Sequence, residues 1–206
     1  MSGGYTVRRW NALPPAPLRA TGDVTAEFLA RGIFTYRSAG RYLAHLSYGR
    51  NTDRSNFHLV LPEGRGTCST KHALLAALAR EQDLPVALML GMYEMNEHNT
   101  PGVGAVLERY GLTSIPEAHC YLKYDAMRID VTRAGVEPTE PIHRFLREEA
   151  ITPAQIGSFK ERWHRQFLRE WLATTAAALQ VSVETLWDIR EQCIAALAQG
   201  SRTQPV

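Results

Sequence analysis

The hydrophobic positions of this chain recur with a helical period in some segments and with the two-residue period of strands in others. Three leucines form an apolar stripe within the Ala- and Leu-rich residues 68–81, which predicts a helix. Asp-Leu-Pro at 83–85 ends this helix, because a residue that precedes proline is disfavoured in helical conformation. Residues 86–92 form an almost continuous apolar run, so we expect a strand covered on both faces.

Strict alternation of polar and apolar residues over 119–124 and 127–132 predicts a β-hairpin. With a two-residue loop, Tyr121 faces Asp130, and His119 lies diagonal to Asp130 on the same, polar face. The other face is then apolar almost throughout. A loop one residue longer would turn Asp130 toward the apolar face, so the pattern itself selects the register that lets Asp130 orient the imidazole of His119.

Helical spacing returns near the C-terminal end of the sequence. Thr152 and Pro153 combine an N-cap threonine with a proline at the first helical position, which predicts a helix over 152–179. An aromatic stripe follows at helical spacing, and a second helix is expected over 182–199. We expect this helix pair, residues 152–199, to pack its stripe against the core or against a second subunit, which leaves a homo-oligomer open.

The remaining segments carry weaker patterns. Prolines predict an extended arm over residues 1–20, and Ser38 is expected to cap a helix that ends near 46. We further expect a strand at 57–61, a short helix at 103–110 and a solvated, charged helix boundary at 144–149. Because the chain contains no internal repeat and no linker rich in Gly or Ser, the predicted fold is a single α+β domain, residues 1–206.

Composition excludes several classes of protein. Of the 206 residues, 45% are hydrophobic and 21% charged, as in ordinary globular proteins. The 23 Lys and Arg residues are interspersed with 21 Asp and Glu residues, so no nucleic-acid partner is expected. The longest apolar run is far shorter than the roughly 20 residues of a membrane span. Three cysteines cannot all pair within one chain, and no export signal precedes them, which predicts free thiols in a cytoplasmic protein.

Cys68 is the first candidate for chemistry, because it follows a glycine-containing turn and opens the helix 68–81. Backbone N–H groups at a helix start have no intrahelical partner, and the helix dipole favours negative charge there. Both effects stabilise a thiolate, and the same N–H groups can donate to a tetrahedral oxyanion. The alternative is a small buried residue that merely precedes a helix.

The chain resembles the transglutaminase-like superfamily, in a bacterial-type branch. The resemblance lies in the order of Cys68, His119 and Asp130 and in their places on a helix and two successive strands. The resemblance covers residues 57–132, about a third of the chain, and rests on four local motifs. These motifs are GTCSTKH at 66–72 followed by ALLAALARE, LPV at 84–86, AHCYL at 118–122 and RIDVT at 128–132.

The resemblance implies a papain-like α+β core over residues 57–132, in which the nucleophile helix packs on a small antiparallel sheet. It also implies a triad in which Cys68 attacks an amide, His119 transfers the proton and Asp130 orients the imidazole. Cys120 departs from the family pattern, which often has an aromatic residue directly after the histidine. No motif identifies a second oxyanion donor; Asn51 is the candidate, and a polar surface turn is its alternative role.

We therefore expect a thiol-dependent hydrolase or acyltransferase that acts on a peptide or small amide and needs no cofactor. Water as acceptor would give a peptidase or amidase, which we favour over cross-linking to an amine. A metal site at His72, Cys120 and His98 is the weaker hypothesis, since these residues lack the spacing of metal ligands. We instead expect His72 to be a hydrogen-bonded helix residue near the cleft floor. A non-catalytic binding module of the same fold remains the alternative, and thiol reactivity would distinguish the two.

Overall fold

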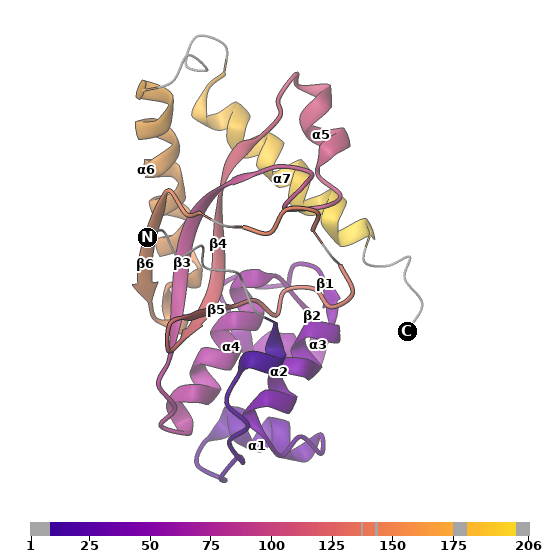
Figure 1. Cartoon of the computed structure of the whole chain (residues 1–206), viewed down its shortest axis with the longest axis vertical. Coiled ribbons are helices and arrows are strands. Elements are labelled where there is room, and N and C mark those ends of the chain that lie inside the picture. Colours follow the sequence, from indigo (N-terminus) through magenta and orange to yellow (C-terminus); the bar gives the residue numbers. More distant parts are fainter. Residues whose placement is uncertain (1–8, 137, 143, 175–180, 201–206) are drawn as a thin grey trace.

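The computed structural model describes residues 9–136, 138–142, 144–174 and 181–200 of the chain, which form an α+β structure (Figure 1). The helices are α1 (Asp23–Ala30), α2 (Tyr36–His45), α3 (Val60–Glu63), α4 (Cys68–Glu81), α5 (Gly104–Arg109), α6 (Ser158–Thr174) and α7 (Val183–Gly200). The strands are β1 (Ser47–Tyr48), β2 (Arg65–Gly66), β3 (Val86–Met95), β4 (Ile115–Tyr124), β5 (Met127–Ile129) and β6 (Arg147–Ile151). Short 3-10 turns occur at Trp10–Ala12, Phe57–Leu59 and Pro153–Ile156.

A four-stranded antiparallel sheet of order β5-β4-β3-β6 runs through the molecule, and β1 and β2 form a separate parallel pair. In the hairpin β4–β5, Tyr124 pairs with Met127 and Leu122 with Ile129. This confirms the predicted two-residue loop, in which Asp125 adopts a left-handed conformation with φ 51°. Strand β5 ends at Ile129, so Asp130 stands just beyond the paired part of the hairpin.

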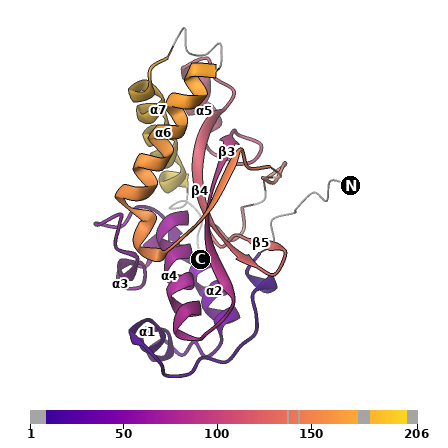
Figure 2. The same cartoon turned by 90° about the vertical axis from the view of Figure 1, so that its left-hand side faces the viewer.

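Helix α4 is the centre of the fold, and every residue from Cys68 to Ala79 is buried. Helices α1 and α2 pack against it in the lower half of Figure 1. With the sheet seen nearly edge-on in Figure 2, α4 and α6 lie on the same side of β3 and β4. Because α4 is covered on all sides, it is rich in Ala and Leu and has no broad polar face.

The C-terminal helices pack as expected against the rest of the chain. Thr152 and Gln155 form a capping box, although it opens the 3-10 turn Pro153–Ile156 and α6 itself begins at Ser158. The expected extension of this helix to residue 179 lies partly outside the described residues, which stop at 174 and resume at 181. The aromatic stripe of α6 contacts both hydrophobic clusters of the core through Phe159, Trp163, Phe167 and Trp171.

Several local predictions were wrong, each for an identifiable physical reason. Residues 57–61 form a 3-10 turn and the start of α3, which Gly64 ends in a left-handed conformation with φ 62°. The charged segment at 144–149 contains most of β6, an edge strand whose outer side accepts Arg and Glu side chains. Ser38 is not an N-cap: Thr35 caps α2, and Ser38 bonds back to it from the first turn.

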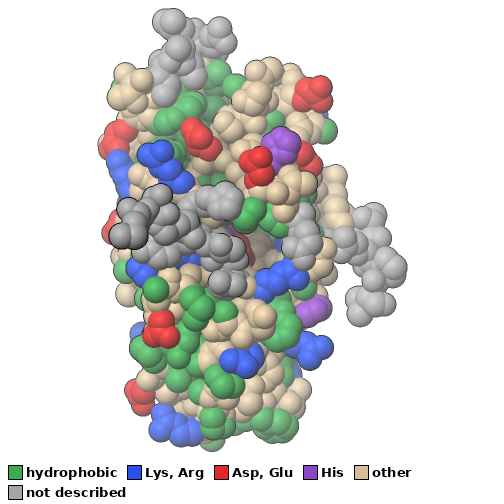
Figure 3. All heavy atoms as spheres, in the orientation of Figure 1, with side chains coloured by type: hydrophobic (Ala, Val, Ile, Leu, Met, Phe, Trp, Pro, Cys, Tyr) green, Lys and Arg blue, Asp and Glu red, His purple; other side chains and the backbone are tan. Residues whose placement is uncertain are grey.

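The expected extended arm is in fact partly packed. Leu13 is fully buried against the N-terminal helices, and Pro17 forms a β-bridge with Thr35. None of the described helices is both long and apolar enough to cross a membrane. On the face drawn in Figure 3, the described Lys and Arg side chains are interspersed with Asp and Glu, as the sequence predicts.

Candidate active site

Cys68 is positioned by a tight junction between β2 and α4. A Cβ atom at Gly66 would lie 2.9 Å from both the Lys71 and the Thr70 side chains, so the junction requires glycine there. The backbone N–H of Thr67 donates to Thr70 Oγ1 over 3.1 Å, which fixes the first turn of α4. As a result, the thiol of Cys68 stands at a helix N-terminus, with 8% of the residue exposed.

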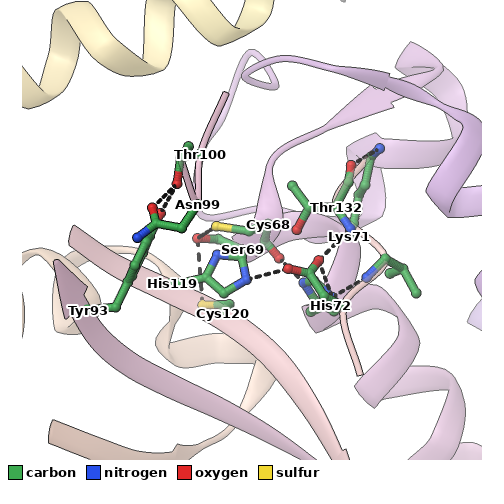
Figure 4. A network of polar contacts seen from close by, with 12 residues as sticks. Cys68, Ser69, Lys71, His72, Tyr93, Asn99, Thr100, His119, Cys120 and Thr132 are labelled. Atoms are coloured by element: carbon green, nitrogen blue, oxygen red, sulfur yellow. Dashed lines mark hydrogen bonds and ion pairs between the residues drawn. The ribbon is translucent and has the colours of Figure 1, made fainter. Parts of the chain in front are cut away.

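His119 lies beside this thiol (Figure 4), and its imidazole contacts Asp130. His119 Nε2 lies 2.7 Å from Asp130 Oδ2, so Nδ1 is the ring nitrogen left for the sulfur of Cys68. The other carboxylate oxygen, Oδ1, accepts the backbone N–H of Thr132 over 2.7 Å, which holds the carboxylate in place. The structure thus brings the three predicted residues together from α4, β4 and the segment after β5.

The three side chains shift each other's proton affinities. Burial alone would raise the pKa of Cys68, but Lys160 and His119 lower it to about 6. Burial opposes the charge on His119 too, yet Asp130 and the thiolate raise the pKa of this imidazole well above its ordinary value. Partial burial of Asp130 would raise its pKa, but the positive His119 beside it keeps that pKa far below the usual range. Near neutral pH the group is a thiolate, an imidazolium and a carboxylate.

His72 lies next to His119, with the ring centres 6.1 Å apart, and confirms the prediction of a hydrogen-bonded helix residue. The backbone N–H of Val131 donates to His72 Nε2 over 2.9 Å, so Nδ1 carries the proton and donates to the Cys68 carbonyl over 2.7 Å. Burial lowers the pKa of His72 to about 4. A neutral His72 therefore ties the start of α4 to the backbone next to Asp130.

Asn51 does not have the role that the sequence suggested. Its amide donates one N–H to Glu63 Oε2 over 3.1 Å and the other to the Arg65 carbonyl over 3.0 Å. Its oxygen accepts the hydroxyl of Thr70 over 2.9 Å, and only 5% of the residue is exposed. Since both amide hydrogens are used, Asn51 has none to offer an oxyanion, and we do not retain it as the donor. Nor is it a surface turn residue: it anchors the preceding loop to α4.

The other two residues of the weaker metal hypothesis are separated into different contacts. His98 is exposed and bonds Thr139, whereas Cys120 is fully buried 3.7 Å from Ser69 Oγ. Over the described ranges, no cluster of three or more His, Cys, Asp or Glu side chains could hold a metal ion. All three cysteines of the chain are free and buried.

Lys160 is a site residue that the sequence analysis missed. This side chain of α6 places Nζ 2.8 Å from Ser69 Oγ and 3.9 Å from Cys68 Sγ, and only 7% of the residue is exposed. Burial alone would lower the pKa of Lys160, but the neighbouring Cys120, Cys68 and Glu117 raise it. Its spacing was the available signal, because Lys160, His164 and Phe167 recur on one helical face and are all buried.

Helix α7 contributes a second buried charge to the site. Arg190 forms two hydrogen bonds with Glu117, of 2.8 and 3.0 Å, and their side chains are 13% and 5% exposed. Burial would raise the pKa of Glu117, but Arg190 lowers it to about 2. Arg190 also lies 5.1 Å from the ring centre of Trp187. This ion pair holds α7 against β4.

Two cavities, of about 330 and 440 Å³, meet at Cys68. The smaller one, the histidine-side cavity, is lined by His119, Asp130 and Tyr93. The larger one, the lysine-side cavity, is lined by Ser69, Lys160 and Trp187. Cys68 lines both cavities, together with Tyr48, Glu117 and Ile194. The thiol is therefore reached from two sides, one with the imidazole of His119 and one with the ammonium group of Lys160.

Comparisons of the chain with family models, with curated proteins and with solved structures gave no match.

Proposed function

We propose that the protein is a thiol-dependent hydrolase or acyltransferase of peptide-like amides, built on a papain- or transglutaminase-like core. One observation carries the proposal: a buried thiol with a pKa of about 6 stands at a helix N-terminus, next to an imidazole held by a carboxylate. Perturbed ionisation of this kind, inside a cavity, is typical of catalytic groups. Neither of the other two cysteines has a lowered pKa. Burial raises the pKa of Cys120, and it raises the pKa of Cys193 to about 11.

The reaction follows from the proton positions. The thiolate of Cys68 attacks the amide carbonyl carbon and forms a C–S bond, while the carbonyl π electrons move to the oxygen. When the C–N bond breaks, His119 Nδ1 donates its proton to the leaving amine, and a thioester remains on Cys68. Asp130 holds Nε2–H and stabilises the positive ring until that transfer.

The second half-reaction restores the thiol group. His119, now neutral, removes a proton from the acceptor, which attacks the thioester and expels the thiolate. Water releases a carboxylic acid, and an amine releases a new amide. We favour water and hence a peptidase or amidase, with the two parts of the substrate extending from Cys68 into the two cavities.

The test compares the three thiols of the same molecule. Iodoacetamide at pH near 6 should alkylate Cys68 well before Cys120 and Cys193, because only Cys68 is substantially ionised there. Peptide mass spectrometry resolves the three rates. In addition, p-nitrophenyl acetate should leave an acetyl group on Cys68, and Cys68→Ser should abolish it, whereas Cys193→Ser should not. Equal, slow alkylation of all three cysteines would refute the proposal and favour a non-catalytic binding module.

A further inference from the structure

Lys160 is a buried cation whose presence packing alone does not explain. Among the described residues no carboxylate forms an ion pair with it, and its only short hydrogen bond is to Ser69 Oγ, at 2.8 Å. Burying an ammonium group without a paired carboxylate is costly, so such a group indicates a functional need for positive charge. The thiol of Cys68, which carries negative charge in the proposed reaction, lies 3.9 Å from Nζ.

The position of Lys160 relative to the base supports a specific role. His119 lines only the histidine-side cavity and Lys160 only the lysine-side cavity, so the two groups flank Cys68 from different sides. In acyl transfer, the group that protonates the leaving amine must face that amine, and the developing oxyanion must face a different donor. Helix α4 supplies one such donor, the backbone N–H at Cys68, which has no intrahelical acceptor.

We propose that Lys160 Nζ is the second oxyanion donor of this site, acting together with the backbone N–H of Cys68. This inference rests on the proposed function. An oxyanion donor should stand about 2.7–3.1 Å from the oxygen in the tetrahedral intermediate. That oxygen is two bonds from the sulfur, so a group 3.9 Å from Cys68 Sγ is within reach of it. Ser69 Oγ holds the ammonium in place and leaves its other N–H bonds for the thiolate and the oxyanion.

A different role would give Lys160 only the task of keeping Cys68 ionised. The two roles separate in a comparison of two reagents. Iodoacetamide alkylates a thiolate without forming an oxyanion, whereas p-nitrophenyl acetate acylates it through a tetrahedral oxyanion. Loss of a counter-ion slows both reactions at low pH only, while loss of an oxyanion donor slows acylation at every pH.

The experiment measures both rates at Cys68 from about pH 5 to about pH 10 in the wild type, Lys160→Met and Lys160→Arg. Lys123→Met, which changes an exposed lysine of β4, is the matched control and should behave as the wild type. In Lys160→Met, alkylation should reach the wild-type plateau at high pH. Acylation at that plateau should remain lower by about 10²–10³-fold, the usual cost of one oxyanion donor. Lys160→Arg keeps the charge and should recover part of the acylation rate.

If both the acylation and the alkylation rates of Lys160→Met reach the wild-type values at high pH, the proposal is overturned and Lys160 is only a counter-ion. A wild-type protein that p-nitrophenyl acetate does not acylate at Cys68 would instead overturn the proposed function, and this inference with it. Should Lys160→Met fail to fold, Ser69→Ala provides the same comparison, because it removes the hydrogen bond that positions Nζ. Its acylation plateau should fall by about tenfold while alkylation is retained; equal plateaus would contradict the proposal.

Discussion

Replacing Asp130 by Asn tests the triad with little change in shape, because the amide fills the same volume. The wild-type thiol has a pKa of about 6, against an ordinary value of 9.0, a difference of about 3 pH units that corresponds to about 4 kcal/mol. The charge of Lys160 contributes to this lowering, and His119 contributes both through its charge and through a hydrogen bond to the sulfur. In Asp130→Asn the imidazolium loses its carboxylate, so His119 releases its proton at lower pH and its share of the lowering disappears.

Because the contribution of Lys160 remains, the pKa of Cys68 should rise only partly toward its ordinary value. We expect the acid limb of the alkylation profile to move upward by about 1 pH unit rather than by the full difference. Acyl transfer should fall further, on the order of 10–10³-fold, since the amide also favours the wrong imidazole tautomer. This loss is smaller than in a serine triad, because a thiolate depends less on a base.

The assay is the rate of iodoacetamide labelling at Cys68 against pH, which needs no known substrate. Asp125→Asn is the matched control: it makes the same change in the hairpin turn, where a left-handed backbone suits Asn. An unchanged profile in Asp130→Asn, at an unchanged melting temperature, would mean that Asp130 does not serve His119. The hairpin register would then have no catalytic meaning.

Three further predictions concern stability, each measured by urea unfolding. His72 has a pKa of about 4 when folded and an ordinary value of 6.5, so between these pH values the unfolded chain binds a proton that the native state excludes. The free energy of unfolding should therefore fall by about 3 kcal/mol as the pH drops from 6.5 to 4. His72→Gln should remove this part of the pH dependence, and the same pH dependence in the variant and the wild type would contradict the prediction. Arg190→Met leaves Glu117 buried and unpaired and should lower the free energy of unfolding by about 3–5 kcal/mol. Arg165→Met, which breaks an exposed ion pair within α6, should lower it by less than about 1 kcal/mol. Equal losses in the two variants would refute this distinction. Leu13→Ala should cost about 2–5 kcal/mol, because this residue is fully buried; a loss near zero would mean that the N-terminal segment is not packed.

The parts of the fold that the sequence predicted are those determined by local pattern. Helix α4 was evident from its composition and from the proline after it, and the register of β4 and β5 followed from a single turn length and one apolar face. Strand β6 was missed because its sequence, Arg-Glu-Glu-Ala-Ile, has no alternation. Only its pairing with β3, a contact distant in sequence, makes it a strand.

The site divides in the same way. Cys68, His119 and Asp130 are marked by a helix start and a hairpin, both of which are short-range features. Lys160 and Arg190 come from α6 and α7, and the sequence alone does not specify how these helices lie across the sheet. A charged residue on a helix is ordinarily solvated, so only the packing of these helices against β4 brings Lys160 to the thiol and Arg190 to Glu117.

The distances at Lys160 explain why one cation can serve both the resting thiolate and the transition state and still accelerate the reaction. An interaction speeds a reaction only if it is stronger in the transition state than in the ground state. In the resting site, Nζ is 3.9 Å from the charged sulfur, longer than a short charge-assisted hydrogen bond. As the carbonyl is attacked, the negative charge moves from the sulfur to an oxygen that can stand about 2.7–3.1 Å from Nζ. The attraction therefore strengthens along the reaction, and the high-pH acylation plateau of Lys160→Met measures that difference directly.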